Sequence, residues 1–256
     1  MNARNSSGNL SPTSSKSALD AAKKRSPKIL VYADGSCLKN GSCDAQAGAG
    51  VVLLTEDRRR IKLKACFLGA LTNQKAEILA CAIALESLKT PCHVRIFSDS
   101  KYVVETMLGK NRMKTNREYW NRLVEACLTH EIEWNWMRGH AGNSYQETAD
   151  RLSRAAATAK ENLDKNTLDR LADLMQGSPG ADVVKMIHDG IKTLAAACDG
   201  ARRSDGQGFN KFDSELGHRF ADKPHITAQE AIVAREMLAK YRTQIAAFDE
   251  QLALIV

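Results

Sequence analysis

Apolar residues near the start of the chain follow a pattern typical of a buried sheet. Residues 28–34, KILVYAD, are apolar on both faces and close on an aspartate, which indicates a central strand that ends at Asp34. Residues 47–54 (AGAGVVLL) and 60–68 (RIKLKACFL) flank the polar turn TEDRR. This arrangement predicts a β-hairpin directly after the central strand.

Helical spacing follows these strands. Residues 72–89 carry apolar residues at helical intervals, and Pro91 closes the pattern, which predicts a helix that ends before the proline. HVRIFSD, residues 93–99, predicts another strand that ends on an aspartate. Residues 100–109 and 117–130 then predict two short helices.

The last predicted strand alternates between apolar and polar residues. In residues 131–138 (EIEWNWMR), Ile132, Trp134 and Trp136 fall on one face, so we expect a half-buried edge strand whose tryptophans lie in the core. The loop GHAGNS leads into a helix over residues 144–159. The order β-β-β-α-β-α-α-β-α predicts an α/β fold with a mixed five-stranded sheet and flanking helices.

The two flanking regions differ from this domain in composition. Residues 1–27 have few large apolar side chains and indicate a disordered basic N-terminal arm before the domain of residues 28–160. Residues 161–256 show helical patterns separated by GSPG and by a Gly/Asp-rich segment. Thr227 and Glu230 predict a capping box that opens a helix, so we expect a small C-terminal helical domain.

The net charge of +7 over 256 residues is unevenly distributed. Residues 29–160 hold nineteen Lys/Arg and fourteen acids, whereas residues 161–256 hold twelve Lys/Arg and fifteen acids. A basic region with acids at its strand ends suits a polyanion bound close to metal ions. The same charge balance also fits an ordinary protein surface, so charge alone does not distinguish a polyanion-binding region from such a surface.

Cysteine usage and hydropathy indicate the compartment. The seven cysteines are odd in number and form no C-x-x-C pair, so we expect reduced thiols and neither disulfides nor a zinc site. No run of eighteen apolar residues and no apolar secretory segment is present, so we expect a cytoplasmic protein that does not bind membranes.

Four carboxylates occupy positions where their negative charge would have to be compensated. The helix of residues 72–89 predicts a crossover that lays the strands ending at Asp34 and Asp99 side by side, with both acids at one edge. Glu77 lies in the second turn of that helix, and Asp150 lies on the last helix of the domain. Clustered carboxylates repel one another, and divalent ions with oxygen ligands, such as Mg²⁺ or Mn²⁺, remove that repulsion.

Each acid also has an ordinary structural explanation. Asp34 in D-G-S suits a turn, and Asp99 suits a helix cap. Glu77 and Asp150, taken singly, suit solvated helix residues. Only the joint arrangement of the four favours a metal site.

The stretch 29–158 resembles the type 1 ribonuclease H family. The matching pieces, in the family's order, are ADGSCLKNG, TNQKAEILACAIALESL, IFSDSKYV and MRGHAGNSYQETADRLSRAA. The resemblance implies a ribonuclease H-like sheet and an endonuclease that hydrolyses the RNA strand of RNA–DNA hybrids with two Mg²⁺ ions, for which Mn²⁺ substitutes. It implies 3′-hydroxyl and 5′-phosphate ends, and it makes His140 a loop residue that assists proton transfer or product release. The implied metal ligands are Asp34, Glu77, Asp99 and Asp150.

The same resemblance implies contacts with the hybrid. A wide minor groove displays the 2′-hydroxyls of the RNA strand, and phosphate contacts fix register without reading sequence. The basic helical handle of longer bacterial members is missing between Lys101 and Trp120, where KNRMKTNR remains. The implied contact residues are Gly35, Ser36, Cys37, Asn40, Thr72, Asn73, Gln74 and Asn116.

The tail from residue 205 also looks like a short module appended to some phage and bacterial nucleic-acid enzymes. One interpretation is a domain that contacts nucleic acid or a protein partner, with Arg235, Lys240 and Arg242 as candidate contacts. The other is a packing extension with ordinary surface charge, which the excess of acids in residues 161–256 favours.

Three functions compete for the whole chain, which we expect to be monomeric. The first is hybrid hydrolysis, and the second is DNA strand transfer or junction resolution on the same fold. The third is a hybrid-binding module without catalysis. The TNQKAE and HAGN segments disfavour the second, and the four acids disfavour the third.

Overall fold

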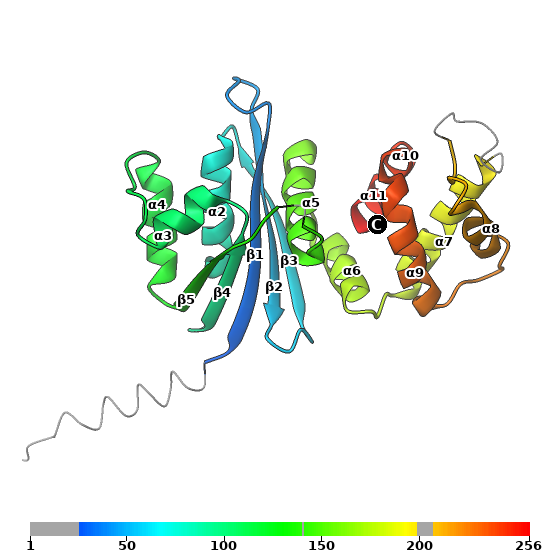
Figure 1. Ribbon diagram of the computed structural model, residues 1–256, viewed down its shortest axis with the longest axis horizontal. Coiled ribbons are helices and arrows are strands. Elements are labelled where there is room, and N and C mark those ends of the chain that lie inside the picture. Colours follow the sequence, from blue (N-terminus) through cyan, green and yellow to red (C-terminus); the bar gives the residue numbers. More distant parts are fainter. Residues whose placement is uncertain (1–25, 140, 199–206) are drawn as a thin grey trace, which may run out of the picture.

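The computed structural model describes residues 26–139, 141–198 and 207–256. The expected basic arm therefore lies almost entirely outside the described residues, as does His140. One sheet forms the centre of the molecule (Figure 1). Its strands are β1 (Lys28–Leu38), β2 (Gln46–Thr55), β3 (Ile61–Gly69), β4 (His93–Ser98) and β5 (Glu131–Trp136).

The sheet has the order β3-β2-β1-β4-β5. β1 pairs with β2 in antiparallel fashion and with β4 in parallel fashion, and β4 pairs in parallel with β5. The expected mixed five-stranded sheet and the parallel placement of the two acid-bearing strands are therefore confirmed. The crossover connection places these strands side by side, as their shared helix requires.

One detail of β1 corrects the sequence prediction. β1 does not end at Asp34, because the strand continues to Leu38, with Asp34 paired to Gly50 and Leu38 to Gln46 of β2. The pairing with β4 stops earlier, at Tyr32. Asp34 therefore lies just beyond the parallel pairing, but inside a strand that the hairpin partner extends.

Helices cover the two faces of the sheet (Figure 1). Odd-numbered residues of β1, such as Val31, pack against α2 and Trp120, whereas even-numbered ones, such as Tyr32, pack against Leu152. This division explains why β1 is apolar on both faces. The helices of the domain are α2 (Asn73–Glu86), α3 (Lys101–Met107), α4 (Arg117–Cys127) and α5 (Ser144–Ala159).

Glycines bring α5 against the backbone of β2. A Cβ atom added at Gly50 would lie 1.9 Å from the carbonyl oxygen of Ala149. One added at Gly48 would lie 2.0 Å from the carbonyl oxygen of Ser153. Any side chain at these positions would push α5 away from the sheet, so the glycines set the depth at which this helix lies.

The remaining helices continue from α5. In α6, Leu171 and Ala172 are buried in the same cluster as Leu152, so α6 packs on the sheet. The later helices enclose a second apolar cluster that includes Ile187 and Phe209. No helix in the described ranges is long and apolar enough to cross a membrane. These elements are α6 (Lys165–Met175), α7 (Ala181–Ala196), α8 (Ser214–Ala221), α9 (Ala228–Leu238), η1 (Ala239–Tyr241), α10 (Arg242–Ala246) and α11 (Glu250–Ile255).

The predicted capping box opens α9. Thr227 accepts a hydrogen bond from the amide of Glu230, and the Glu230 side chain accepts one from the amide of Thr227. The helix ends at Leu238, and η1, α10 and α11 follow it towards the C-terminus. The breaks between these elements let short helices fold back over the second apolar cluster.

Candidate active site

The four predicted acids line a single hollow. Asp34 comes from β1, Glu77 from α2 and Asp150 from α5, and Asp99 follows the last residue of β4. The hollow is polar, has a volume of about 230 Å³, and also contains Gly35, Ser36, Asn73 and Arg154. Four separate elements of the fold thus bring carboxylates from positions 34 to 150 together.

Hydroxyl and amide groups orient two of these carboxylates. The Ser153 hydroxyl donates to Oδ2 of Asp34 at 2.7 Å. Asn73 Nδ2 donates to Oε1 of Glu77 at 2.9 Å, and the Ser100 hydroxyl donates to Oε2 of the same residue. Both acids are therefore held by neutral donors that leave their negative charge in place.

The other two acids have different surroundings. Arg154 Nε contacts Oδ1 of Asp150 at 2.8 Å, one helical turn away on α5. Gln146 Nε2 lies 3.4 Å from Oδ1 of Asp99, and the indole nitrogen of Trp136 donates to the Asp99 carbonyl at 3.0 Å. Arg154 is thus the cation that directly faces an acid at the rim of the hollow.

Burial and like charges raise the pKa of the central acid. The pKa of Asp34 is raised to about 7, mainly because the carboxyl group is buried. The Ser153 hydrogen bond lowers this pKa, and the nearby charges of Asp99, Asp150 and Glu77 contribute to its rise. The pKa of Glu77 is raised as well, first by burial and against the Ser100 hydrogen bond. Among the described residues that line the hollow, four carboxylates face one guanidinium group, so acids outnumber cations there.

The donor set fits hard divalent cations. Carboxylate oxygens are the ligands that Mg²⁺ and Mn²⁺ prefer, and a polar hollow leaves room for the waters that Mg²⁺ retains. In the ranges that the structure describes, no three His, Cys, Asp or Glu side chains are already drawn into a closed ligand group.

The predicted substrate contacts divide into two groups. Gly35, Ser36 and Asn73 line the hollow, and the Ser36 hydroxyl is buried without a hydrogen-bond partner in the described structure. Asn40 accepts a hydrogen bond from the amide of Asn73 at 3.1 Å, and Cys37 donates to the Leu71 carbonyl at 2.9 Å. These contacts join the loop after β1 to the start of α2.

The other predicted contacts lie outside the hollow. Thr72 is the N-cap of α2 but its side chain makes no capping hydrogen bond, and Gln74 is exposed in the first turn. Asn116 is the N-cap of α4 and has a left-handed backbone, with φ at 59°. Its amide lies 3.4 Å from the Tyr102 hydroxyl.

Sequence reasoning missed several residues of the site. The partners Ser153 and Ser100 carry no motif of their own, although Ser100 directly follows Asp99. The spacing of four residues between Asp150 and Arg154 on a predicted helix was a usable signal. The list of missed residues is Ser100, Trp136, Gln146, Ser153 and Arg154.

The expectation that all three tryptophans are core residues is confirmed for Trp120 and for Trp134, which packs partly buried against the core, and is wrong for Trp136. Trp120 is fully buried, as predicted. Trp136 is 46% exposed at the end of β5, and Lys101 Nζ lies 4.8 Å from its ring centre. The ring lies at the very end of the edge strand, where its nitrogen donates to the Asp99 carbonyl.

The candidate nucleic-acid contacts in the tail are also corrected. Arg235 and Arg242 point into the chain, where they donate to the carbonyls of Ile255 and Val256 at 2.9 and 2.5 Å. Lys240 contacts Asp213 at 2.9 Å. All three expected cations therefore make contacts within the chain, although the Lys240 side chain stays exposed.

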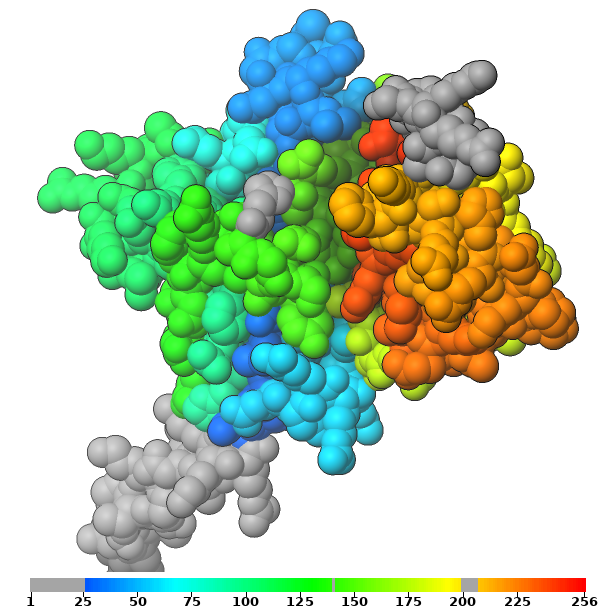
Figure 2. All heavy atoms as spheres, turned by 45° about the vertical axis from the view of Figure 1, so that its right-hand side comes forward, coloured from blue at the N-terminus to red at the C-terminus, as the bar shows by residue number. Residues whose placement is uncertain are grey.

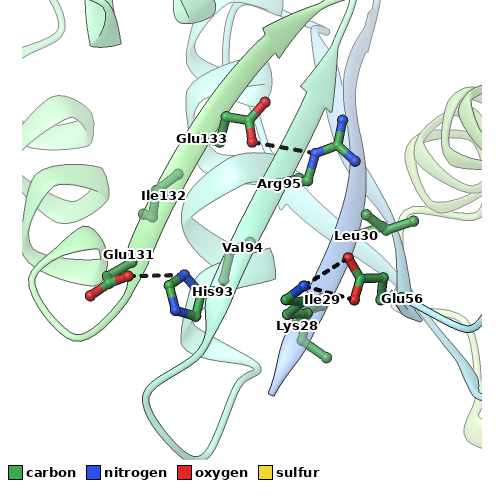
Figure 3. A pocket seen from close by; sticks show the side chains of 10 residues that line it. All are labelled: Lys28, Ile29, Leu30, Glu56, His93, Val94, Arg95, Glu131, Ile132 and Glu133. Carbon is green, nitrogen blue, oxygen red and sulfur yellow. Dashed lines mark hydrogen bonds and ion pairs between the residues drawn. The ribbon is translucent and has the colours of Figure 1, made fainter. Parts of the chain in front are cut away.

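A second, larger hollow of about 330 Å³ lies at the other end of β1 (Figure 3). Its charged residues pair across the sheet: His93 with Glu131 at 2.9 Å and Arg95 with Glu133 at 3.4 Å. Lys28 pairs with a glutamate of the β2–β3 turn. Neighbouring strands here match opposite charges, so this hollow lacks the unneutralised acids of the first.

Comparisons with known proteins show similarity to one family over part of the chain. The family model for RNase H matches residues 26–158. A ribonuclease H of Shewanella amazonensis is 39% identical over 146 residues, which cover 52% of this chain and 90% of that protein. A ribonuclease H of Desulforamulus reducens is 35% identical over 144 residues, 51% of this chain and 87% of that protein. The crystal structure of LC9-RNase H1, a type 1 RNase H with the type 2 active-site motif, is 27% identical, with a TM-score of 0.47, over 59% of this chain and 83% of that one.

Proposed function

The chain belongs to the RNase H family, and we propose that it is an endonuclease that hydrolyses the RNA strand of RNA–DNA hybrids. The proposed reaction uses two divalent metal ions and leaves 3′-hydroxyl and 5′-phosphate ends. We further propose that a monomer acts through a domain of residues 28–160, with residues 1–27 as an arm and 161–256 as an accessory domain. The observation that carries the proposal is the convergence of four carboxylates in one polar hollow.

Asp34, Glu77, Asp99 and Asp150 would hold the ions. When bound, the ions supply charge neutralisation and lower the pKa of a coordinated water. The raised pKa of Asp34 supports this role, because cations would return this acid to its ionised form. The Ser153 hydroxyl orients the Asp34 carboxylate through Oδ2, which leaves Oδ1 available to the hollow.

Residues at the rim would position the RNA strand. The buried Ser36 hydroxyl has no hydrogen-bond partner among the described residues. The energetic cost of this unpaired group would be relieved when a 2′-hydroxyl or phosphate oxygen binds it. Asn73 extends from the start of α2 into the same hollow, where it also orients Glu77. Arg154 holds Asp150 and stands where it would meet the negative charge of a phosphodiester.

His140 would act from the loop between β5 and α5. Imidazole titrates near neutral pH and suits proton transfer to the leaving oxygen. This role rests on the resemblance of the sequence alone, because the residue lies outside the described structure.

The test is a cleavage assay on the full chain with three labelled substrates: an RNA–DNA hybrid, duplex RNA and duplex DNA. With Mg²⁺ we expect cleavage of the RNA strand of the hybrid only, and none with EDTA. Cleavage of duplex DNA would instead support strand transfer or junction resolution. Hybrid binding without cleavage in Mg²⁺ or Mn²⁺ would support a non-catalytic module and refute the proposal.

A further inference from the structure

Arg151 connects the catalytic helix to the end of the C-terminal helices. Its Nη1 donates to the carbonyl of Val256 at 2.5 Å, and its Nη2 lies 3.1 Å from the Thr148 hydroxyl. Successive residues of an α-helix point about 100° apart. While Asp150 faces the hollow, Arg151 therefore faces the end of α11, and both are fixed by the same turn of α5.

Polar and apolar contacts seat α11 beside α5. Arg235 and Arg242 donate to the carbonyls of Ile255 and Val256, so three guanidinium groups meet the carbonyl end of this helix. The carbonyls at the end of a helix lack intrahelical partners and carry the negative end of its dipole. In addition, Leu254 packs against the apolar cluster that contains buried residues of α5. Figure 2 shows the orange and red C-terminal helices against the green surface of the domain.

Contacts on several sides hold α5 in place. Gly48 and Gly50 present bare backbone to α5 and set how closely the helix approaches β2. On the same face, Leu152 of α5 is buried in a cluster with Tyr32 of β1. The Ser153–Asp34 hydrogen bond is one restraint on rotation, and it acts on the hollow side. Arg151 acts on the opposite flank.

We propose that the C-terminal helices position the catalytic helix, and that Arg151 is the positioning residue through which α11 holds Asp150 in the hollow. This inference rests on the proposed function, since it assigns Asp150 to metal binding. In this proposal the accessory helices have an intramolecular role, because their contact with Arg151 limits the movement of α5. A displacement of about 1 Å is enough to impair a site built on fixed geometry.

The test measures Mn²⁺ binding to the full chain without substrate, from the electron paramagnetic resonance signal of the free ion, at a temperature well below unfolding. Arg151→Met removes the donors but keeps much of the apolar stem. Leu254→Ala loosens the same contact from the α11 side, so the test stands even where Arg151→Met does not fold. We expect Kd for Mn²⁺ to rise roughly 3- to 30-fold in both variants. Arg151→Lys should lie between Arg151→Met and the wild type.

The matched control is Arg122→Met, which removes a two-point contact of 2.7 and 2.8 Å between Arg122 of α4 and Glu86, the last residue of α2, neither of which lines the hollow. It should change the unfolding temperature little, and Kd for Mn²⁺ should stay as in the wild type. Wild-type Mn²⁺ affinity in folded Arg151→Met or Leu254→Ala would overturn the inference, as would an equal loss in Arg122→Met. A wild-type chain that neither binds Mn²⁺ nor cleaves the hybrid would refute the proposed function itself.

Discussion

Replacing Asp34 by asparagine should stabilise the protein in the absence of metal while abolishing cleavage. Asp34 lies partly buried among three other acids, and its pKa is raised to about 7. The amide of the variant has nearly the same shape and still accepts the Ser153 hydrogen bond. It removes the negative charge that burial and the neighbouring carboxylates oppose.

The magnitude follows from the pKa difference between the folded and unfolded chain. A folded pKa of about 7, against the ordinary value of 3.8, means that the folded state holds its proton more strongly. The stabilisation from this proton is complete below pH 3.8 and is lost as pH rises through about 7. At pH 8 the free energy of unfolding of the wild type is lower by at most roughly 4 kcal/mol than that of a chain with a permanently neutral group at this position. At pH 5 the difference is less than half of this.

Because the carboxylate keeps some contact with solvent, we expect Asp34→Asn to raise the free energy of unfolding by about 2–4 kcal/mol at pH 8. The assay is urea unfolding of the wild type and Asp34→Asn in EDTA at pH 5 and pH 8. The variant should be more stable at pH 8, with a smaller gain at pH 5. Millimolar Mg²⁺ should narrow the gap at pH 8, because it stabilises the ionised wild-type site.

Two results would refute this reasoning. Equal stability of the two proteins at pH 8 in EDTA would show that Asp34 is not held in an unfavourable environment. An equal gain in the free energy of unfolding at both pH values would show that the ionisation of Asp34 is not its cause. Cleavage at the wild-type rate by Asp34→Asn would separately refute its assignment as a metal ligand.

Three further predictions concern the same site. Glu77→Gln keeps the contacts to Asn73 and Ser100 but should slow hybrid cleavage at least a hundredfold, measured as kcat at saturating Mg²⁺. Gly50→Ala would place a methyl group against the backbone of α5 and should lower the free energy of unfolding by about 1–3 kcal/mol in urea, so unchanged stability would contradict the close approach. His140→Ala should slow turnover less than the change at Glu77 does, and complete loss of activity in the same assay would show that the histidine has a larger role.

Several features of the fold followed from local pattern. Alternation and helical spacing predicted the strands, the crossover helix and the mixed sheet, because these depend on which residues must be buried. The capping box at Thr227 was readable for the same reason, since all of its atoms lie within one turn. The identity and order of the four acids, together with the motifs around them, were enough to indicate the family.

Local pattern failed where partners are distant in sequence. It ended β1 at Asp34, because the turn signal of D-G-S outweighed a hairpin partner that continues to Leu38. It placed Trp136 in the core, because alternation cannot tell that the end of an edge strand has no cover. Both errors arise from tertiary context overriding a local preference.

The sequence by itself determined the elements of this protein, the chemistry of its four acids and the family to which it belongs. Only the tertiary structure decided that Asp34 takes its hydrogen bond from Ser153, 119 residues away, and that its pKa is raised. Only the tertiary structure turned Arg242 inward and joined Arg151 to a carbonyl 105 residues away. Burial and long-range contact depend on how whole elements pack, and no pattern within a short segment records which distant surface will lie against it.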